Sequence, residues 1–372
     1  MLIGVPKEVK VHEYRVGMTP GAVREAVSHG HSVLVETGAA AQQGIPDTEY
    51  ERAGAHIAKS ADEVFAEADL IVKVKEPQAG ECRRLRDGQT LFTYLHLAAD
   101  TEQAKALVKS GVTAIAYETV TSPRGGLPLL APMSEVAGRM AVQAGAHCLE
   151  MEQGGRGVLL GGVAGVPAAR VTVLGGGVAG VNAVRMAIGL EARVTVLDID
   201  VARLSAIDQQ FGACVDTAFS TRQTIEEHVT ASDLVIGAVL VPGAAAPKLI
   251  TREMVRAMPR GSVVVDIAID QGGCAETSRP TTHAKPTFVD EGVVHYCVTN
   301  MPGAVARTST FALNNATLPF VLAIANKGAR QALLDDPHLR AGLNVHAGKV
   351  TYRAVSEATG LAYTDARDAL EG

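Results

Sequence analysis

Residues 169–180 read Ala-Arg-Val-Thr-Val-Leu-Gly-Gly-Gly-Val-Ala-Gly, and this segment gives the clearest indication of the fold class. Its first half has the short, apolar, β-branched composition of a buried strand. Its second half satisfies the spacing G-x-G-x-x-G. A helical pattern follows, and a second strand, Arg193 to Leu197, leads directly to Asp198. A strand, a glycine turn, a helix and a second strand ending in an acid together predict a doubly wound domain that binds a dinucleotide.

Each glycine in this spacing has a physical role. Gly175 allows the tight turn, Gly177 lets the main chain approach a pyrophosphate, and Gly180 lets the helix pack closely on the strand. The helix N-terminus adds N–H groups and a partial positive charge. Asp198 can accept hydrogen bonds from ribose hydroxyls and would repel a 2′-phosphate. Asp198 therefore favours NAD over NADP. The glycine spacing alone would be weak evidence, because a glycine-rich turn in an α/β protein often binds no ligand.

Composition narrows the class of protein. The chain has 372 residues, enough for two domains, and a net charge of −6. It has no basic stripe with interleaved aromatics, which argues against nucleic acid or a membrane surface as partner. Its five cysteines are scattered, which argues for a reducing compartment. The apolar stretches at 158–181 and 234–247 are broken by Gly, Pro or Arg, so we interpret them as buried strands and turns. With no signal-peptide pattern, we expect a cytoplasmic protein.

The glycine turn sits near the middle of the chain, so another domain precedes it. Strands and Ala/Glu-rich helices alternate there, which predicts a second, mostly parallel sheet. The predicted fold is α/β, with two doubly wound Rossmann-like domains and the dinucleotide-binding domain, 129–306, inserted in a substrate domain made of 1–128 and 307–372. The strands predicted for the first domain are Leu2–Val5, Ser32–Glu36, Leu70–Lys75, Thr90–Leu95 and Thr113–Tyr117.

The second half continues the same alternation. Its later strands are predicted at Leu234–Val239, Ser262–Ile269 and Val293–Val298. Ser134 begins a helical pattern, and its plainest role is that of an N-cap. A long helix is predicted from Arg307 to about Leu334, after which the tail is too short to be a domain and is expected to complete the first one.

Four ionisable residues fall at the ends of predicted strands or in the loops after them, where open α/β sheets bind their ligands. These are Arg15, Lys75, His96 and Asp270. Arg binds a carboxylate in a fork, and Lys adds positive charge. His titrates near neutrality and can exchange a proton with the substrate. These four residues together fit a small carboxylate substrate. His96 would exchange a proton with its reacting oxygen or nitrogen, and Asp270 would orient water or an amine beside the nicotinamide.

Plainer interpretations of these residues remain open at this point. Arg15 is consistent with ordinary surface charge, and Lys73 and Lys75 with an exposed face of a strand. A histidine at a strand end is more often structural than catalytic, and Asp270 could cap the following turn. Asp266 competes with Asp270, but it lies inside the predicted strand and is expected to be buried and hydrogen-bonded.

Several longer motifs resemble the L-alanine dehydrogenase family. They are GVPKE (4–8), EYRVGMTP (13–20), VKVKEP (72–77), FTYLHLA (92–98), VVDIAIDQGGCAETSRPTTH (264–283) and GVVHYCVTNMPGAV (292–305). The resemblance spans essentially the whole chain. It implies reversible oxidative deamination of L-alanine to pyruvate and ammonium, with NAD as hydride acceptor, and a homohexamer.

The resemblance also implies roles for individual residues. Arg15 and Lys75 would bind the substrate, and His96 and Asp270 would be the acid/base pair. Beyond the glycine turn (Gly175, Gly177, Val178, Ala179, Gly180), the implied NAD contacts are Ser134, Asp198, Arg203, Ser220, Val239, Leu240, Ile267, Ala268, Ile269, Asp270, Arg279, Val298, Thr299, Asn300 and Met301. Some members carry a metal near the position of Glu118 with a histidine of the late helix. That helix reads Ala325-Asn326-Lys327 here, so no metal is predicted.

Two other functions stay open. The NAD-binding component of a proton-translocating transhydrogenase resembles the same family, and it would need a membrane partner. The four residues Arg15, Lys75, His96 and Asp270 argue against that alternative. A NAD-responsive protein without turnover, or a related amino-acid dehydrogenase, is also compatible with the fold.

Overall fold

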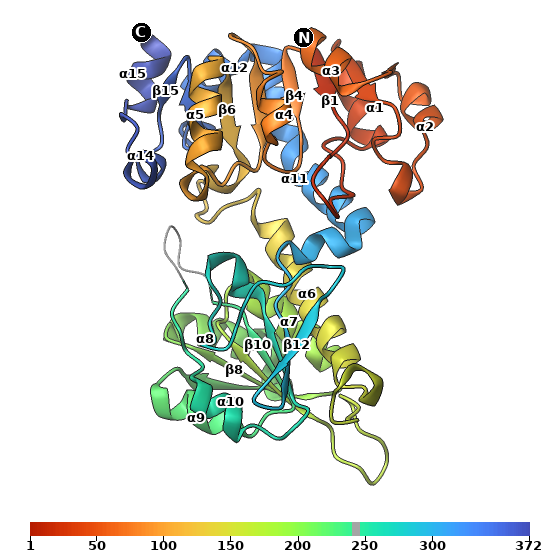
Figure 1. The fold of residues 1–372 in the computed structure, drawn as a ribbon, viewed down its shortest axis with the longest axis vertical. Helices are drawn as coiled ribbons and strands as arrows, with labels where there is room; N and C mark the ends of the chain where they lie inside the picture. Colours follow the sequence, from red (N-terminus) through yellow and green to blue (C-terminus); the bar gives the residue numbers. More distant parts are fainter. Residues whose placement is uncertain (240–245) are drawn as a thin grey trace. The chain divides into compact units, whose positions relative to one another are not determined.

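The structure is a computed structural model that describes residues 1–239 and 246–372. The chain folds into two compact units, one made of Met1–Met133 with Val305–Gly372 and the other of Ser134–Ala304. The predicted substrate and dinucleotide-binding segments have boundaries a few residues away from these. Figure 1 shows both units as α/β folds, and each is described by itself below.

In the described part of the chain, the first unit is built on an eight-stranded sheet of order β15-β14-β6-β5-β4-β1-β2-β3. Strands β1 to β6 are parallel to one another, and β14 and β15 are antiparallel additions at one edge. The antiparallel pairing of β14 with β6 adds the C-terminal segment to the sheet of the N-terminal segment. The strands are β1 Leu2–Val5, β2 Ser32–Glu36, β3 His56–Ala58, β4 Leu70–Val72, β5 Thr90–Thr93, β6 Thr113–Ala116, β14 Leu343–His346 and β15 Lys349–Val350.

Helices pack in front of and behind this sheet (Figure 1). The strands β4, β5 and β6 are buried along their whole length, as expected for parallel strands covered on both faces. One apolar core joins them to α3 and α5 through side chains such as Phe65, Ile71, Leu91 and Leu107. The helices of the unit are α1 Pro20–Ser28, α2 Asp47–Arg52, α3 Ala61–Glu67, α4 Ala79–Cys82, α5 Thr101–Ser110, α11 Ala306–Lys327, α12 Ala329–Asp335, α13 Pro337–Arg340, α14 Arg353–Thr359 and α15 Ala366–Glu371.

The second unit is built, over its described residues, on a seven-stranded sheet of order β12-β13-β11-β10-β7-β8-β9. All strands are parallel except β12. The apolar run predicted at 169–174 is the central strand β7, and its core includes Leu174, Val235 and Val264. The strands are β7 Arg170–Leu174, β8 Arg193–Asp198, β9 Val215–Phe219, β10 Leu234–Gly237, β11 Val263–Asp266, β12 Thr287–Asp290 and β13 Val293–Tyr296. The helices are α6 Ala131–Cys148, which begins in the first unit, α7 Val178–Gly189, α8 Val201–Phe211, α9 Arg222–Thr230 and α10 Arg252–Ala257.

The two sheets share one topology. Counted from the first strand of each unit, the parallel strands have the order 3-2-1-4-5-6 in both. In each sheet the chain reverses its direction of winding between the first and fourth strands, which are β1 and β4 in one unit and β7 and β10 in the other. Ligands of doubly wound sheets bind beyond the carboxyl ends of the strands at this point. The predicted fold class of two doubly wound domains is confirmed.

Several predicted elements differ in detail. The strands predicted from Leu70, Thr90, Thr113, Leu234, Ser262 and Val293 all end earlier than predicted. Buried apolar residues such as Val74, Leu95 and Val298 continue into the loops, so the apolar pattern extends past the strand ends. Residues Ile267–Gln271 form a short 3-10 helix, η6, instead of continuing β11. The strands β3, β9, β12, β14 and β15 were not predicted. The apolar residues Leu159, Val163 and Val166 are exposed, so the interpretation of that stretch as buried is wrong there.

Two predictions about helices are also wrong. The helix predicted from Arg307 to Leu334 is two helices, α11 and α12, separated by Gly328, whose φ of 78° and ψ of 149° are not helical. Helix α6 begins at Ala131, so Ser134 lies in its first turn and is not its N-cap.

Candidate active site

Arg15 lies in the loop that follows β1, on the carboxyl side of the sheet of the first unit. The loop packs directly on the end of β4, because a Cβ at Gly17 would approach the carbonyl oxygen of Val72 to 2.2 Å. Only glycine fits this contact. Thr19 then ends the loop as the N-cap of α1, accepting a hydrogen bond from the N–H of Ala22. These local features fix the path of the loop beside the reversal point of the sheet.

The guanidinium of Arg15 is buried and paired with Glu13. Its Nε and Nη2 donate to the two carboxylate oxygens of Glu13 at 2.7 and 2.6 Å, and Nη1 lies 3.0 Å from Sδ of Met133. Burial alone would lower the pKa of Arg15, but Glu13 outweighs it and the pKa is raised. The guanidinium therefore stays charged in a fixed orientation. The interpretation of Arg15 as surface charge is wrong.

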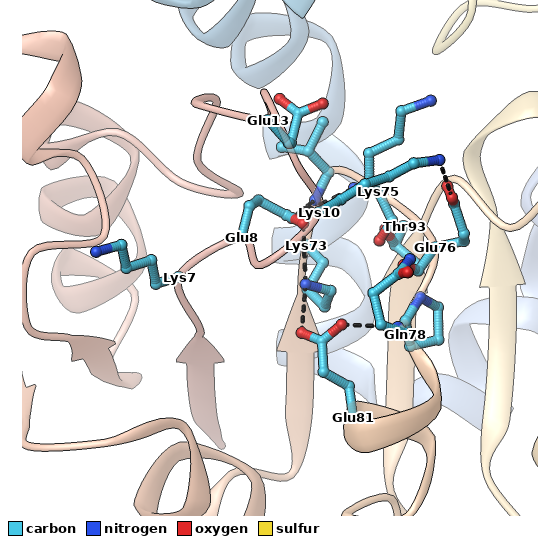
Figure 2. A network of polar contacts seen from close by, with 12 residues as sticks. Lys7, Glu8, Lys10, Glu13, Lys73, Lys75, Glu76, Gln78, Glu81 and Thr93 are labelled. Atoms are coloured by element: carbon cyan, nitrogen blue, oxygen red, sulfur yellow. Dashed lines mark hydrogen bonds and ion pairs between the residues drawn. The ribbon is translucent and has the colours of Figure 1, made fainter. Parts of the chain in front are cut away.

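Lys75 follows β4, and its main chain is held on both sides. Its N–H donates to Oε1 of Glu8 at 3.2 Å, and its carbonyl oxygen accepts from Oγ1 of Thr93 at 2.9 Å. Lys73 is completely buried and forms ion pairs with Glu8 and Glu81 at 3.0 and 2.7 Å (Figure 2). The interpretation of Lys73 as part of an exposed strand face is therefore wrong.

His96 follows β5 in a strained conformation. Its φ of 51° and ψ of 35° lie in the left-handed region, which costs a residue with a Cβ about 1 kcal/mol. The carboxylate of Glu118 holds this turn by accepting the N–H of His96 at 2.6 Å and that of Leu95 at 3.2 Å. The imidazole is half exposed, and its ring stacks parallel to that of Tyr94 with 5.9 Å between centroids. Strain at a half-exposed histidine is a typical feature of functional sites.

Sequence reasoning missed the residues that support these three side chains. Glu8 and Glu13 lie in the loop after β1, and Tyr94 lies beside His96 and donates its hydroxyl to the carbonyl of Leu129 at 2.5 Å. A local signal existed, because the loop after a buried strand carries two glutamates within eight residues of Arg15. The pairing of Glu8 with Lys73 depends on strand order, and the pairing of Glu13 with Arg15 depends on burial of their loop. The local signal contains neither.

In the second unit, the glycine turn follows β7 as predicted. Gly175 has a φ of 97°, which favours glycine. A Cβ at Gly180 would approach the carbonyl oxygen of Gly175 to 1.8 Å, so helix α7 lies directly against the turn. A Cβ at Gly177 would meet nothing within 4 Å, which leaves open space beside the N-terminus of α7. The turn therefore fits the pyrophosphate of a dinucleotide.

Asp198 ends β8 and is nearly buried. Its Oδ2 accepts the N–H of Gly176 at 2.7 Å, and its Oδ1 accepts that of Asp200 at 2.9 Å. The acid predicted to bind ribose thus also fixes the glycine turn. Arg203 lies 3.5 Å from Oδ2 of Asp198 and is half exposed. An arginine at this position can attract the 2′-phosphate of NADP, so it opposes the repulsion expected from Asp198.

The other predicted cofactor residues follow the carboxyl ends of several strands of the same sheet. Ser220 follows β9, Val239 follows β10, Ile267 to Asp270 form η6 after β11, and Val298 to Met301 follow β13. The guanidinium of Arg279 stacks on the ring of Phe288, 4.2 Å from its centroid. Leu240 lies outside the described residues.

Asp270 and Asp266 have different environments. Asp270 is exposed in η6. Asp266 is completely buried at the end of β11 and accepts hydrogen bonds from the N–H of Cys274 at 2.8 Å and Oγ of Ser278 at 2.6 Å. Asp266 therefore fixes the loop that follows η6, and the expectation that it is buried and hydrogen-bonded is confirmed. The carboxylate of Asp270 is exposed to solvent, whereas that of Asp266 is buried and hydrogen-bonded within the fold.

The described residues contain no helix long and apolar enough to span a membrane. Across the same residues, no three side chains of His, Cys, Asp or Glu gather as metal ligands would. None of the five cysteines, all of which lie in the described part, forms a disulfide.

The fold is that of a doubly wound dehydrogenase, with a glycine turn that fits a dinucleotide in one unit and charged side chains at the strand ends of the other. Family models give the particular family. The model "Alanine dehydrogenase/PNT, N-terminal domain" matches residues 4–137, and "Alanine dehydrogenase/PNT, C-terminal domain" matches residues 141–353. The chain belongs to the alanine dehydrogenase/PNT family.

Individual relatives agree over nearly the whole chain. An alanine dehydrogenase of Halomonas elongata is 63% identical and covers 98% of this chain and 99% of the relative. One of Bacillus subtilis is 55% identical, covering 100% and 98%. Among solved structures, an L-alanine dehydrogenase has a TM-score of 0.94 at 51% identity, covering 97% and 99%. A transhydrogenase from Sinorhizobium meliloti has a TM-score of 0.83 at 29% identity, covering 94% and 100%.

Proposed function

We propose that this protein catalyses the reversible, NAD-dependent oxidative deamination of L-alanine to pyruvate and ammonium. The observation that carries the proposal is the shared position of Arg15, Lys75 and His96, which follow β1, β4 and β5 on the carboxyl side of one doubly wound sheet. Two cations and an imidazole at a reversal point suit a small, anionic substrate that gains and loses protons. The alanine dehydrogenases that resemble the chain over its full length support the same function.

Substrate binding is assigned to the two cations. Arg15 pairs with the substrate carboxylate through Nη1 and the second N–H of Nη2, because Nε and the first N–H of Nη2 bind Glu13 and hold the guanidinium in a fixed plane. Lys75 places positive charge beside the keto oxygen of pyruvate or the developing carbinolamine. The ammonium group of lysine acts here as a point charge, and its effect depends on how accurately its main chain is held.

Proton transfer is assigned to His96 and Asp270. In the direction of deamination, the amine of the bound L-alanine is neutral, so that loss of a hydride from Cα leaves an iminium. His96 orients a water molecule that attacks the iminium carbon and accepts the proton released, and Asp270 is assigned as the second acid/base group. The carbinolamine then collapses to pyruvate and ammonium, with His96 exchanging the proton between oxygen and nitrogen.

The cofactor assigned to the glycine turn is NAD, which supplies the hydride acceptor when bound. The residues that would hold it are Gly175 to Gly180 at the pyrophosphate and Asp198 at the ribose. The open space at Gly177 and the start of α7 at Val178 fit that role. The preference for NAD over NADP belongs to the proposal, because Asp198 and Arg203 act in opposite directions on a 2′-phosphate. The homohexamer and the cytoplasmic location stay predictions.

The test is the near-ultraviolet absorbance of NADH, measured with purified protein at alkaline pH. L-alanine, D-alanine and glycine are compared as substrates, each with NAD and with NADP. We expect absorbance to rise with L-alanine and NAD. A rise with NADP of equal rate would remove the selectivity given to Asp198. No rise with either cofactor would contradict the proposed function.

The structural similarity to a transhydrogenase supports a second candidate, a NAD(H)-binding module that performs no amino-acid chemistry. The same cuvettes separate the two. A chain that binds NADH, detected by quenching of its fluorescence, but oxidises no amino acid would favour the binding module.

A further inference from the structure

We propose that Glu8 is a positioning residue that holds the main chain of Lys75 in the conformation needed to bind the substrate. In this proposal, the buried ion pairs of Lys73 with Glu8 and Glu81 hold the side chain of Glu8 in place. The proposal rests on the proposed function for the role of Lys75, but not for the contacts of Glu8. Figure 2 shows the residues involved, which come from the loop after β1, the loop after β4 and helix α4.

One carboxylate organises the main chain on both sides of Val74. Oε1 of Glu8 accepts the N–H of Val74 at 2.7 Å and that of Lys75 at 3.2 Å. Glu8 itself lies 65 residues away from Lys73 in the chain. A residue of the first loop therefore supplies the hydrogen-bond acceptors that a strand neighbour would supply if β4 continued. β4 ends at Val72, and beyond this point the carboxylate of Glu8 accepts the main-chain hydrogen bonds of Val74 and Lys75.

The other oxygen of Glu8 is held by a buried cation. Nζ of Lys73 lies 3.0 Å from Oε2 of Glu8 and 2.7 Å from Oε1 of Glu81, and all three side chains are buried. Burial alone would lower the pKa of Lys73, but the two carboxylates outweigh it and the pKa is raised. The lysine is charged, and it orients Glu8 so that Oε1 faces the two N–H groups.

Glu81 connects this cluster to the next helix. Its Oε2 accepts the N–H of Gln78 at 2.8 Å, which forms a capping box at the start of α4. The segment from Lys73 to Gln78 is thus held at its first residue by an ion pair, in its middle by Glu8 and Thr93, and at its end by Glu81. An ion pair between Lys10 and Glu76 is a second contact between the loop after β1 and the loop after β4.

A triad placed only for stability would be an unusual choice, because apolar residues of similar volume stabilise a buried site as well or better. Its geometry instead converges on the main chain of a residue assigned to the substrate. Replacing Glu8 should therefore change the affinity for substrate more than the affinity for NADH, which is bound by groups of the other unit.

The experiment compares Glu8→Ala and Glu8→Gln with the wild-type protein and with Glu63→Gln. Glu63 is a matched control, because its Oε2 accepts the N–H of Lys59 at 2.8 Å in a segment without predicted site residues. Glu8→Gln keeps an acceptor for the two N–H groups but loses the charge that Lys73 binds. Each protein is studied by amide hydrogen exchange of the peptide containing residues 73–78 and by steady-state kinetics with pyruvate, ammonium and NADH.

We expect exchange in this peptide to accelerate by roughly tenfold in Glu8→Ala, with the strands of the second unit unchanged. We expect the KM for pyruvate to rise by about 10- to 100-fold, with the KM for NADH within about twofold. Glu8→Gln should lie between Glu8→Ala and the wild type, and it decides the matter if Glu8→Ala does not fold. Glu63→Gln should behave as the wild type.

Unchanged exchange at residues 73–78 in either Glu8 variant would overturn the proposal. Faster exchange there with an unchanged KM for pyruvate would also overturn it, because Glu8 would then be structural only. If the wild-type protein has no activity with pyruvate, the proposed function fails, and the exchange data alone decide whether Glu8 holds Lys75.

Discussion

The two units of this chain have the same strand order and different chemistry at the same place. Beyond the carboxyl ends of its strands, the first unit presents charged side chains that are held by other buried charges, such as Arg15 on Glu13. The second unit presents main chain, in a turn where Gly180 and Gly175 leave no room for a Cβ. The topology decides where a ligand binds, and the residues of the loops decide what binds.

The difference follows from the ligands proposed for the two edges. A pyrophosphate is large and doubly charged, and it is bound well by several N–H groups of a helix N-terminus. A small amino or keto acid offers few atoms, so each must meet a specific side chain. We therefore expect the first unit to be sensitive to loss of individual side chains, and the second to be sensitive to gain of atoms at glycine.

The largest effect is expected at His96. Replacing it by Ala should lower kcat by about 10²- to 10⁴-fold, the usual range for a general acid or base. The KM for NAD should change little, because the nucleotide is assigned to the other unit. The measurement is steady-state turnover of L-alanine and NAD. His56→Ala, which removes an exposed histidine from β3 of the same unit, is the control. Near-normal turnover of His96→Ala would remove His96 from the mechanism.

Gly180→Ala tests whether the second unit is sensitive to an added atom in its glycine turn. The added Cβ would lie 1.8 Å from the carbonyl oxygen of Gly175, so the turn must move. We expect NADH binding, measured by fluorescence titration, to weaken by about 10- to 100-fold, as overpacking of about 1–3 kcal/mol would cause. Gly189→Ala lies in the same helix with nothing within 4 Å of the new Cβ, and it should bind NADH normally. Equal affinities for the two variants would contradict the role given to Gly180.

Asp198 is an exception to the contrast between the two units, because it is a predicted ligand-binding side chain in the unit that otherwise presents main-chain groups. Asp198→Ala should weaken NAD binding and lower the ratio of kcat/KM for NAD to that for NADP by up to about tenfold, because Arg203 then remains beside the ribose. The ratio is measured with L-alanine at saturation. Asp200→Ala, which removes the N-cap of α8, is the control. An unchanged ratio would mean that the turn alone selects the cofactor.

The smallest effect is expected at the exposed ion pairs of Glu291, which contrast with the buried pairs of the first unit. Its contacts with Arg256 and Arg252 lower its pKa from 4.5 to about 2. A lowered pKa stabilises the folded state above pH 4.5, and that contribution is lost as pH falls toward 2. Glu291→Gln should therefore lower Tm slightly at neutral pH, and the difference should close over this range. A difference that is constant with pH would contradict the assignment.

Much of the fold could be predicted, because local patterns of apolar, β-branched and turn-forming residues indicate where strands and helices lie. The bounds of β1, β2 and the end of β8 at Asp198 were predicted correctly, since runs of apolar and β-branched residues between turn residues define strands by themselves. The short strands β3 and β15 were missed, because two or three residues carry no periodicity. Gly328 ends α11 within a sequence that otherwise favours helix.

The candidate site divides in the same way. The sequence was sufficient to place Arg15, Lys75 and His96 at or just after the carboxyl ends of strands and the glycine turn after β7, because these positions follow from the order of residues along the chain. Lys75 was predicted as the last residue of its strand, and it lies three residues beyond the end of β4. Three further features become visible in the folded chain: Lys73 is buried between Glu8 and Glu81, Glu13 orients Arg15, and Glu118 holds the turn at His96. The ion pair of Lys73 with Glu8 and the turn held by Glu118 at His96 join segments that become neighbours through the strand order. Arg15 and Glu13 are only two residues apart, and their pairing depends on the burial of the loop that carries both. Pairing and burial are set by the packing of the whole sheet, and no local pattern contains them.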